Sequence, residues 1–306
     1  MKTLVFCNNI QSAQIIFELI RRRIFSGIVI PSSNSELVNE ISSSGYVEST
    51  KMFVVDHNND SEIIDVLNDT QSNVCIVATF PKIFSQEIID IPELGFFNFH
   101  YGILPKYRSA DPVFWQIKNE ENQAGVSVIK MDASIDGGAI VLMKKFPLEP
   151  YDTYGILLHK SVAVACQLLA EFIDALTSEK IVYKPQNLNG SVYLPKPTLK
   201  DVTIDWKQMS MSEVVAMINA GNPWNRGAIT RYEGEEIRIV QVSPAKYNKD
   251  LPDDAGKIIL ANQQYGVFVV CKNKELIRIE TIHSAVGYNS GGMILTTGIK
   301  EGKLFV

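Results

Sequence analysis

Short apolar runs alternate with amphipathic segments through the first hundred residues of this 306-residue chain. The runs predicted to be β-strands are Leu4–Cys7, Gly27–Pro31, Met52–Val55, Val74–Ala78 and Gly95–Phe99. Between the strands, apolar side chains recur at helical spacing. The predicted helices are Ser12–Arg23, Ser35–Ile41, Ser61–Leu67 and Gln86–Ile91. Strands that alternate with helices form βαβ units. The sequence therefore predicts an α/β fold with a Rossmann-like, mainly parallel sheet and flanking helices.

The next hundred residues predict the end of this sheet and a connection to a second domain. Two further strands are predicted at Val126–Lys130 and Ile140–Lys144. A long amphipathic helix is predicted at Tyr154–Thr177, where apolar residues fall on one stripe. The stretch from Lys184 to Asp201 is polar and rich in proline, and it contains Gly190. Because proline and glycine interrupt helices and strands, this stretch is predicted to be a linker.

The C-terminal third is rich in short strand patterns. After a short helix at Ser212–Ile218, the predicted strands are Arg226–Tyr232, Glu236–Gln241, Gly256–Leu260, Gly266–Val270 and Glu275–Ile282. Several short strands at regular spacing are typical of a small OB-like β-barrel. We therefore expect one domain at 1–184, a linker at 185–203 and an OB-like domain at 204–306.

Charge and cysteine content lower the expectation for several classes of protein. The formal charge of −5 gives no general attraction to nucleic acid, although a local basic patch stays open. The four cysteines form no CxxC pair, so neither a zinc site nor a disulfide framework is indicated. The N-terminal apolar run is too short for a signal peptide, and no uninterrupted run of 18 apolar residues is present. We expect reduced cysteines, a cytoplasmic location and no membrane span.

The turn after the first strand lacks a nucleotide-binding fingerprint. Cys7–Ser12 reads CNNIQS rather than G-x-G-x-x-G, and the chain contains no Walker A sequence. A nicotinamide cofactor at that turn is therefore not expected.

Asn98 and His100 lie where a predicted parallel strand ends. Ligands bind beyond the carboxyl ends of such strands, and the two side chains share one side of the strand. An Asn N–H can donate to an oxygen that gains negative charge, and a His can relay a proton. Asp136, in the loop before Ile140, could orient the imidazole. Equally, Asn98 could cap a turn, His100 could be a satisfied buried histidine and Asp136 could serve an Asp-Gly turn. The residues alone leave both interpretations open.

A resemblance to a known family favours the catalytic interpretation. The segment Asn98–Arg108, NFHYGILPKYR, resembles the signature of the formyltransferases that use 10-formyltetrahydrofolate. In that family an Asn-x-His is followed by Leu-Pro-x-Tyr-Arg and by an Asp 36 residues after the His, which is the separation of His100 and Asp136 here. Asn119–Lys130 is similar to the family's Asn-Gly-Glu-x-x-x-Gly-Val-Thr segment, with Ser127 in place of Thr.

The resemblance extends into the second domain. Asp205-Trp206 and the segment Ile218–Ala228, INAGNPWNRGA, look like the opening of the family's OB-like C-terminal domain. Asn222-Pro223-Trp224 could serve there only as a turn with a packing tryptophan. The resemblance therefore covers both expected domains.

The family implies an enzyme that moves a formyl group from N10 of the folate to a primary amine without a metal. Asn98 would donate to the oxyanion of a tetrahedral intermediate, His100 would act in proton transfer and Asp136 would tune His100. The residues implied at the folate are Lys82, Ile83, Phe84, Leu104, Asp132, Ala133, Ser134 and Ile135. Without the resemblance, Lys82 would be an exposed lysine, and Ile83 and Phe84 ordinary core positions.

Departures from the family pattern concentrate near the acceptor side. They are Tyr101-Gly102-Ile103, Ser109-Ala110-Asp111 and Gly137. We predict that Tyr101, Gly102, Asn8 and Asn9 contact the acceptor.

Three kinds of acceptor or partner compete. Methionyl-tRNA formyltransferases carry a basic insertion after the second strand, whereas Pro31–Gly45 contains no Lys or Arg. Residues 201–306 hold twelve basic and twelve acidic side chains, although phosphate binding normally shows as a basic stripe. The basic run Arg21-Arg22-Arg23 is interpreted as the solvated end of the first helix.

These observations favour a small amine, most of all a nucleotide-linked amino sugar. The opening segment, Leu104–Arg108 and the Asn-Pro-Trp segment resemble the UDP-4-amino-4-deoxy-L-arabinose formyltransferase. Methionyl-tRNA and a noncatalytic folate-binding or carrier-docking role remain the alternatives. The oligomeric state stays open, with a homodimer among the choices.

Overall fold

The computed structural model describes residues 1–189, 191–248 and 250–306, and the chain forms two compact units. The first unit comprises 1–112, 124–146 and 158–194, and the second comprises 113–123, 147–157 and 195–306. Gly190 of the expected linker lies outside the described residues. The domain boundaries at 184/185 and 203/204 stay predictions.

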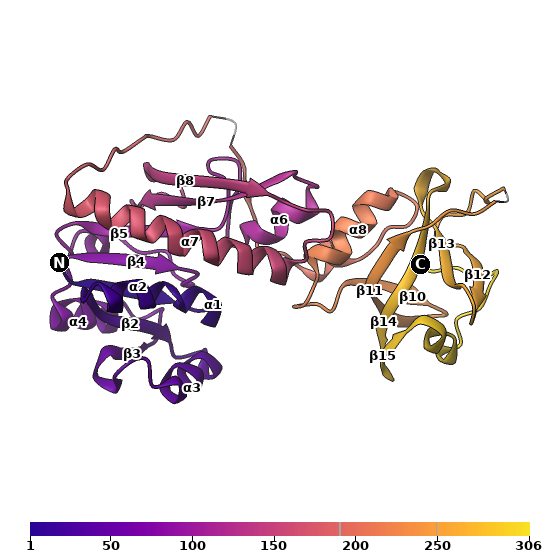
Figure 1. The fold of residues 1–306 in the computed structure, drawn as a ribbon, viewed down its shortest axis with the longest axis horizontal. Helices are drawn as coiled ribbons and strands as arrows, with labels where there is room; N and C mark the ends of the chain where they lie inside the picture. Colours follow the sequence, from indigo (N-terminus) through magenta and orange to yellow (C-terminus); the bar gives the residue numbers. More distant parts are fainter. Residues whose placement is uncertain (190, 249) are drawn as a thin grey trace. The chain divides into compact units, whose positions relative to one another are not determined.

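A seven-stranded sheet forms the centre of the first unit, in the order β3-β2-β1-β4-β5-β7-β8 (Figure 1). The strands are β1 Thr3–Cys7, β2 Phe25–Pro31, β3 Met52–Val55, β4 Val74–Ala78, β5 Gly95–His100, β7 Gln123–Lys130 and β8 Ile140–Pro147. The first five strands pair in parallel, and β7 joins β5 antiparallel. The order 3-2-1-4-5 is that of a Rossmann-like half, and the predicted fold class is confirmed.

Helices connect the strands much as the apolar spacing predicts. They are α1 Ile10–Ala13, α2 Ile15–Arg21, α3 Ser35–Ser44, α4 Asp60–Thr70, α5 Gln86–Ile89, α6 Pro112–Lys118 and α7 Tyr154–Thr177. The helix expected at Ser12–Arg23 is two helices, and the first begins earlier because Asn9 caps it through Gln11 N and Ser12 N. Helix α5 ends before Ile91, since a residue that precedes proline is disfavoured in helical conformation.

The side chains of β5 alternate between two layers. Phe97 and Phe99 pack on Phe172 of α7, with ring centroids 4.6 and 6.0 Å apart. Phe96 points the other way and contacts Phe6 and Phe84 at 5.4 and 5.0 Å. This alternation places Asn98 and His100 on the side of Phe96, away from α7.

Helix α7 has the length and apolar composition of a membrane-spanning helix. Its side chains Leu168, Leu169, Phe172 and Ile173 are nevertheless buried inside the first unit. Burial of this kind is the ordinary state of a core helix, which passes the same test of length and composition.

The second unit is an antiparallel β domain preceded by the helix α8 Met211–Ala220. Its strands are β10 Ala228–Tyr232, β11 Glu235–Pro244, β12 Ile258–Asn262, β13 Gly266–Val270, β14 Leu276–Ser284 and β15 Gly287–Ser290. They run in the order β10-β11-β14-β13-β12, with β15 on β14. Leu304 bridges Lys257 and Phe305 bridges Tyr232, so the C-terminal residues join the two edges of the sheet.

The second unit packs around buried aromatic and aliphatic side chains. Phe305 stacks on Trp206 with ring centroids 6.0 Å apart and lies 5.6 Å from Tyr232. In the segment after α8, Trp224 donates its indole N–H to Ala220 O, and Asn222 donates to Ile218 O and Val240 O. These contacts make Asn222-Pro223-Trp224 a turn, in which the Trp224 side chain is 43% exposed.

Phe305→Ala should destabilise the second unit. The ring is 2% exposed and closes the sheet, so its loss should lower the free energy of unfolding of this unit by about 3–5 kcal/mol. Urea unfolding followed by tryptophan fluorescence measures the change. The neighbouring Leu304→Ala removes a side chain that is 46% exposed and serves as the control. Equal losses in the two variants would contradict this account of the core.

Candidate active site

Three polar side chains meet at the carboxyl end of β5. Asn98 and His100 are two residues apart on this strand, on the same side. Asp136 comes from the loop between β7 and β8. The Asn98 amide donates to Asp136 Oδ1 at 3.4 Å, and the His100 Nδ1 lies 3.6 Å from the same oxygen. The structure therefore brings together the three residues predicted to be catalytic.

The His100 ring is buried and held in one orientation. Its side chain is 5% exposed, and Nε2 lies 2.7 Å from the carbonyl oxygen of Tyr107. Because a carbonyl oxygen can only accept, Nε2 is the donor in this contact. Nδ1 therefore faces the Asp136 carboxylate, with which it forms an ion pair when the ring is protonated.

The Asp136 carboxylate is fixed from two sides. Oδ1 faces Asn98 and His100, and Oδ2 accepts from the backbone N–H of Ser109 at 3.2 Å. The residue itself has φ of 50°, a left-handed conformation that is uncommon for a residue with a side chain. Such a conformation persists only where the surroundings hold it.

The backbone after His100 is held by a residue that is not among the predicted site residues. Ser127 on β7 is opposite His100 and fully buried. Its hydroxyl donates to Gly102 O at 2.7 Å and accepts from Leu104 N at 3.2 Å. The signal available in the sequence was a hydroxyl residue between two valines of a strand, Val126 and Val128.

One of the two segments predicted to flank the folate, Asp132–Ile135, is bonded to Gln86, two residues after the other segment, Lys82–Phe84. Ala133 N donates to Gln86 Oε1 at 3.2 Å, which joins the start of α5 to the β7–β8 loop. Within that loop Ser134 N donates to Asp132 Oδ1 at 2.9 Å, and Ile135 is 38% exposed.

The remaining residues predicted at the folate occupy unlike environments. Ile83 is exposed, whereas Phe84 and Leu104 are buried. Lys82 is mostly buried, and its ammonium donates to His57 O at 2.8 Å and to Asp60 Oδ1 at 2.6 Å. Folate contact by these residues stays a prediction.

The residues predicted at the acceptor have structural partners. Asn9 caps α1, and Asn8 accepts from the Asn34 amide at its backbone and side-chain oxygens. Tyr101 is 4% exposed, and its hydroxyl donates to Ser12 Oγ at 2.9 Å. Burial raises the pKa of Tyr101, so the phenol stays neutral. Acceptor contact by Asn8, Asn9, Tyr101 and Gly102 stays a prediction.

Comparisons with known proteins match two parts of this chain to a protein family. Residues 30–173 match the family described as Formyl transferase, and residues 197–289 match Formyl transferase, C-terminal domain. The methionyl-tRNA formyltransferase of Dictyoglomus thermophilum is 32% identical over 222 residues, which cover 72% of this chain and 70% of the relative. That of Dictyoglomus turgidum is 30% identical over 72% of this chain and 69% of the relative.

Solved structures agree with the fold. HypX from Aquifex aeolicus, crystallised with tetrahydrofolic acid, aligns with a TM-score of 0.66 at 15% identity over 98% of this chain. The chain spans about half the length of HypX, since the alignment covers 48% of it. The N-formyltransferase of Helicobacter canadensis, in complex with folinic acid and dTDP-3-aminofucose, aligns at 0.64 with 16% identity over 90% of this chain and 98% of that one.

Gly102→Ala should strain the loop behind His100. A Cβ at residue 102 would lie 2.7 Å from Pro112 Cβ and 3.0 Å from His100 Nε2. Overpacking of this kind costs about 1–3 kcal/mol of unfolding free energy, measurable by thermal or urea unfolding. Gly292→Ala is the control, because its Cβ would meet nothing nearer than 3.8 Å. If the two substitutions had the same effect, the crowding at Gly102 would not matter.

Proposed function

The chain belongs to the formyl transferase family and is a folate-dependent formyltransferase, and we propose that it formylates the amine of a nucleotide-linked amino sugar. The donor in this proposal is 10-formyltetrahydrofolate. The convergence of Asn98, His100 and Asp136 at the end of β5 is the observation that supports the reaction.

The chemical step needs an oxyanion donor and a proton carrier. The amine nitrogen attacks the formyl carbon, and the carbonyl π electrons move to the oxygen. In our proposal Asn98 Nδ2 donates to that oxygen, exchanging the long 3.4 Å contact with Asp136 for a partner that gains charge. The intermediate collapses when the bond to N10 breaks, while the amine loses a proton and N10 gains one.

His100 is assigned the proton transfer. The Tyr107 carbonyl holds Nε2, so Nδ1 is the ring nitrogen that exchanges protons in this proposal. The Asp136 carboxylate at 3.6 Å stabilises the ring when it carries the proton. Asp136 thereby assists His100 through this ion pair, without itself contacting the reacting carbon.

The folate is assigned to the surface between the start of α5 and the β7–β8 loop. Tetrahydrofolic acid and folinic acid are the ligands named for HypX and for the Helicobacter enzyme. In this chain, the Gln86–Ala133 hydrogen bond joins Asp132–Ile135 to the residues just after Lys82–Phe84. Phe84 packs on Phe96, which is on the same side of β5 as Asn98, and Asp136 contacts Asn98 itself. We infer that the pterin binds there.

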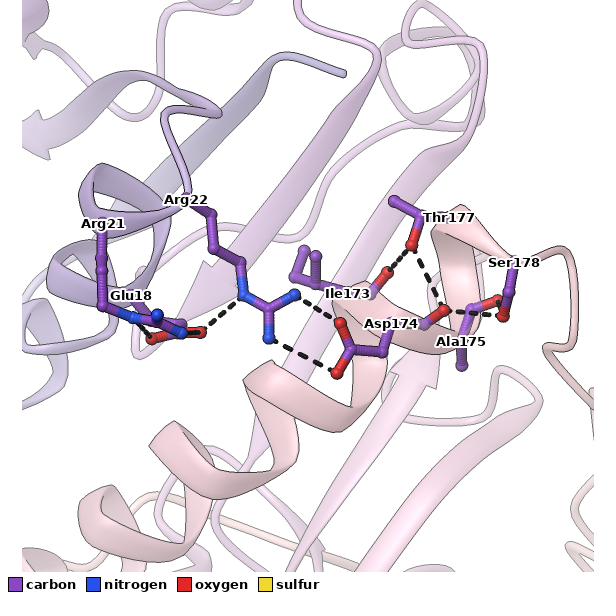
Figure 2. Close-up of polar contacts among 8 residues, drawn as sticks. All are labelled: Glu18, Arg21, Arg22, Ile173, Asp174, Ala175, Thr177 and Ser178. Carbon is purple, nitrogen blue, oxygen red and sulfur yellow. Dashed lines mark hydrogen bonds and ion pairs between the residues drawn. The ribbon is translucent and has the colours of Figure 1, made fainter.

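The distribution of charge in the chain favours a small acceptor. Figure 2 shows that two arginines of the basic run at the end of α2 are paired: Arg21 and Arg22 both contact Glu18, and Arg22 also contacts Asp174 of α7. Hydrogen bonds from Arg21 and Arg22 lower the pKa of Glu18 to about 2, so the carboxylate stays charged at every pH used for assays. The two arginines therefore add little net charge for phosphate binding.

Two further features agree with a small acceptor. The segment Pro31–Gly45 forms the end of β2 and the helix α3, and its only charged residues are Glu36 and Glu40. The stretch 201–306 has no net charge. A protein that grips a tRNA backbone needs several cations in contact with phosphates. We also infer a cytoplasmic location, which suits the four free cysteines.

Methionyl-tRNA is the second candidate acceptor. The observation in its favour is that the relatives described above at 30–32% identity are methionyl-tRNA formyltransferases. A noncatalytic folate-binding or carrier-docking role is a weaker alternative, since such a module has no need of the converged Asn98, His100 and Asp136.

His100→Ala and Asp136→Asn should each lower turnover by about 10²–10⁴-fold, since they remove the proton carrier or its partner. Release of tetrahydrofolate from formylated folate, with an accepted amine, gives the rate, and circular dichroism checks that the fold is intact. His159→Ala, on α7, is the matched control and should retain turnover. Near-normal turnover in both site variants would rule out the assigned roles.

The acceptor assay compares charged initiator tRNA with a panel of nucleotide-linked amino sugars at equal donor concentration. We expect formylation of a sugar, with turnover that varies little between 50 and 200 mM salt. Binding through six or more phosphates would instead lose about 10³-fold or more over that range. Fast, salt-sensitive turnover with tRNA alone would show that the acceptor is tRNA and not an amino sugar. Folate binding without turnover on any amine would support the docking role.

A further inference from the structure

A segment expected to be a linker wraps around the loop that carries Asp136. Ile140 and Lys184 exchange two backbone hydrogen bonds, of 2.8 and 2.9 Å, at the start of β8. The chain then continues to the short strand β9, Tyr193–Leu194, which pairs in parallel with β6, Arg108–Ser109. We name the described residues 184–189 and 191–194 the strap. Both of its ends are therefore anchored within the first unit.

Gln186 of the strap holds the backbone of the Asp136 loop. Its amide nitrogen donates to Asp136 O at 2.9 Å and to Gly138 O at 2.7 Å. A carboxamide NH₂ has two hydrogens, and these two carbonyls take both. The opposite orientation would place the amide oxygen against two carbonyl oxygens, so the contacts fix which way the amide points.

The same loop is held on its other side by Arg108. The guanidinium donates to Ile135 O through Nε at 2.9 Å and through a terminal nitrogen at 2.6 Å. Ser109 N then reaches the Asp136 carboxylate. Three carbonyls around Asp136 are thus bound by side chains from Arg108 and Gln186, while the left-handed φ of Asp136 is otherwise disfavoured.

We propose that Gln186 is a positioning residue for the reaction: by binding the carbonyls on both sides of Gly137, it sets the Asp136 carboxylate against His100. This inference rests on the proposed role of Asp136. Gln186 itself touches neither the folate nor the amine in this account. A displacement of the loop by about 1 Å would be enough to lower the rate substantially, because misplacement of that size can cost about 10²-fold.

Gln186→Glu is the sharpest substitution. It keeps the size of the side chain but replaces the donor by an anion that faces two carbonyl oxygens. Turnover should fall about 10- to 100-fold in Gln186→Glu. It should fall less in Gln186→Ala, because water can replace the lost donor. Gln167→Glu is the matched control, since Gln167 uses its amide oxygen to accept from Lys144, and a carboxylate can do the same.

A double-mutant cycle separates positioning from general loosening of the fold. If Gln186 acts through Asp136, adding Gln186→Glu to Asp136→Asn should lower turnover no further than Asp136→Asn alone. Fully additive losses would overturn the proposal, as would normal turnover in Gln186→Glu. Normal turnover in Asp136→Asn would instead refute the proposed role of Asp136, so the two failures are distinguishable.

A spectroscopic reading adds a test that does not depend on turnover. The measurement is the NMR resonance of the His100 imidazole in protein that carries isotope-labelled histidine. The resonance is assigned by its loss in His100→Ala. We expect Gln186→Glu and Asp136→Asn to shift that signal, and Gln167→Glu to leave it in place. An unchanged His100 signal in Gln186→Glu would show that the strap does not control this pair.

Discussion

The alternation of side chains along β5 is the constraint on which the site depends. Phe97 and Phe99 are buried against α7, and this burial fixes the register of the strand. A shift by one residue would turn both rings toward the polar site and bury Asn98 and His100 in the apolar layer against α7, at a cost of several kcal/mol. The hydrophobic effect therefore sets the side of β5 on which Asn98 and His100 lie, and contacts with Tyr107 and Asp136 then orient the His100 ring.

Much of the fold could be predicted from the chain, because it rests on local patterns. Apolar runs such as Val74–Ala78 and Gly266–Val270 match the strands residue for residue, since a strand buried on both faces is apolar throughout. The short strands β6 and β9 could not be predicted, because a two-residue strand exists only through its partner. The helix α6 also carries no clear period in seven residues.

The candidate site divides in the same way. Asn98, His100 and Asp136 were found from spacing and family resemblance. The residues that hold them, Ser127 and Gln186, act by binding backbone carbonyls, and a carbonyl leaves no mark in the sequence. The role of Gln186 was also missed because the residue lies in a polar stretch that has the composition of a linker. Tertiary contacts between sequence-distant segments were thus the part that pattern reasoning missed.

The strap has a consequence for the order in which this enzyme is made. The five parallel strands are complete once the chain reaches His100, and their core can form from neighbouring βαβ units. The loop around Asp136, however, is bound by a segment some fifty residues further along the chain, beyond the whole of α7. Contacts between distant residues form late in folding, because closing a long loop costs entropy. A nascent chain can therefore form its five parallel strands before the strap holds the Asp136 loop, and on the proposed role of Gln186 full activity follows docking of the strap.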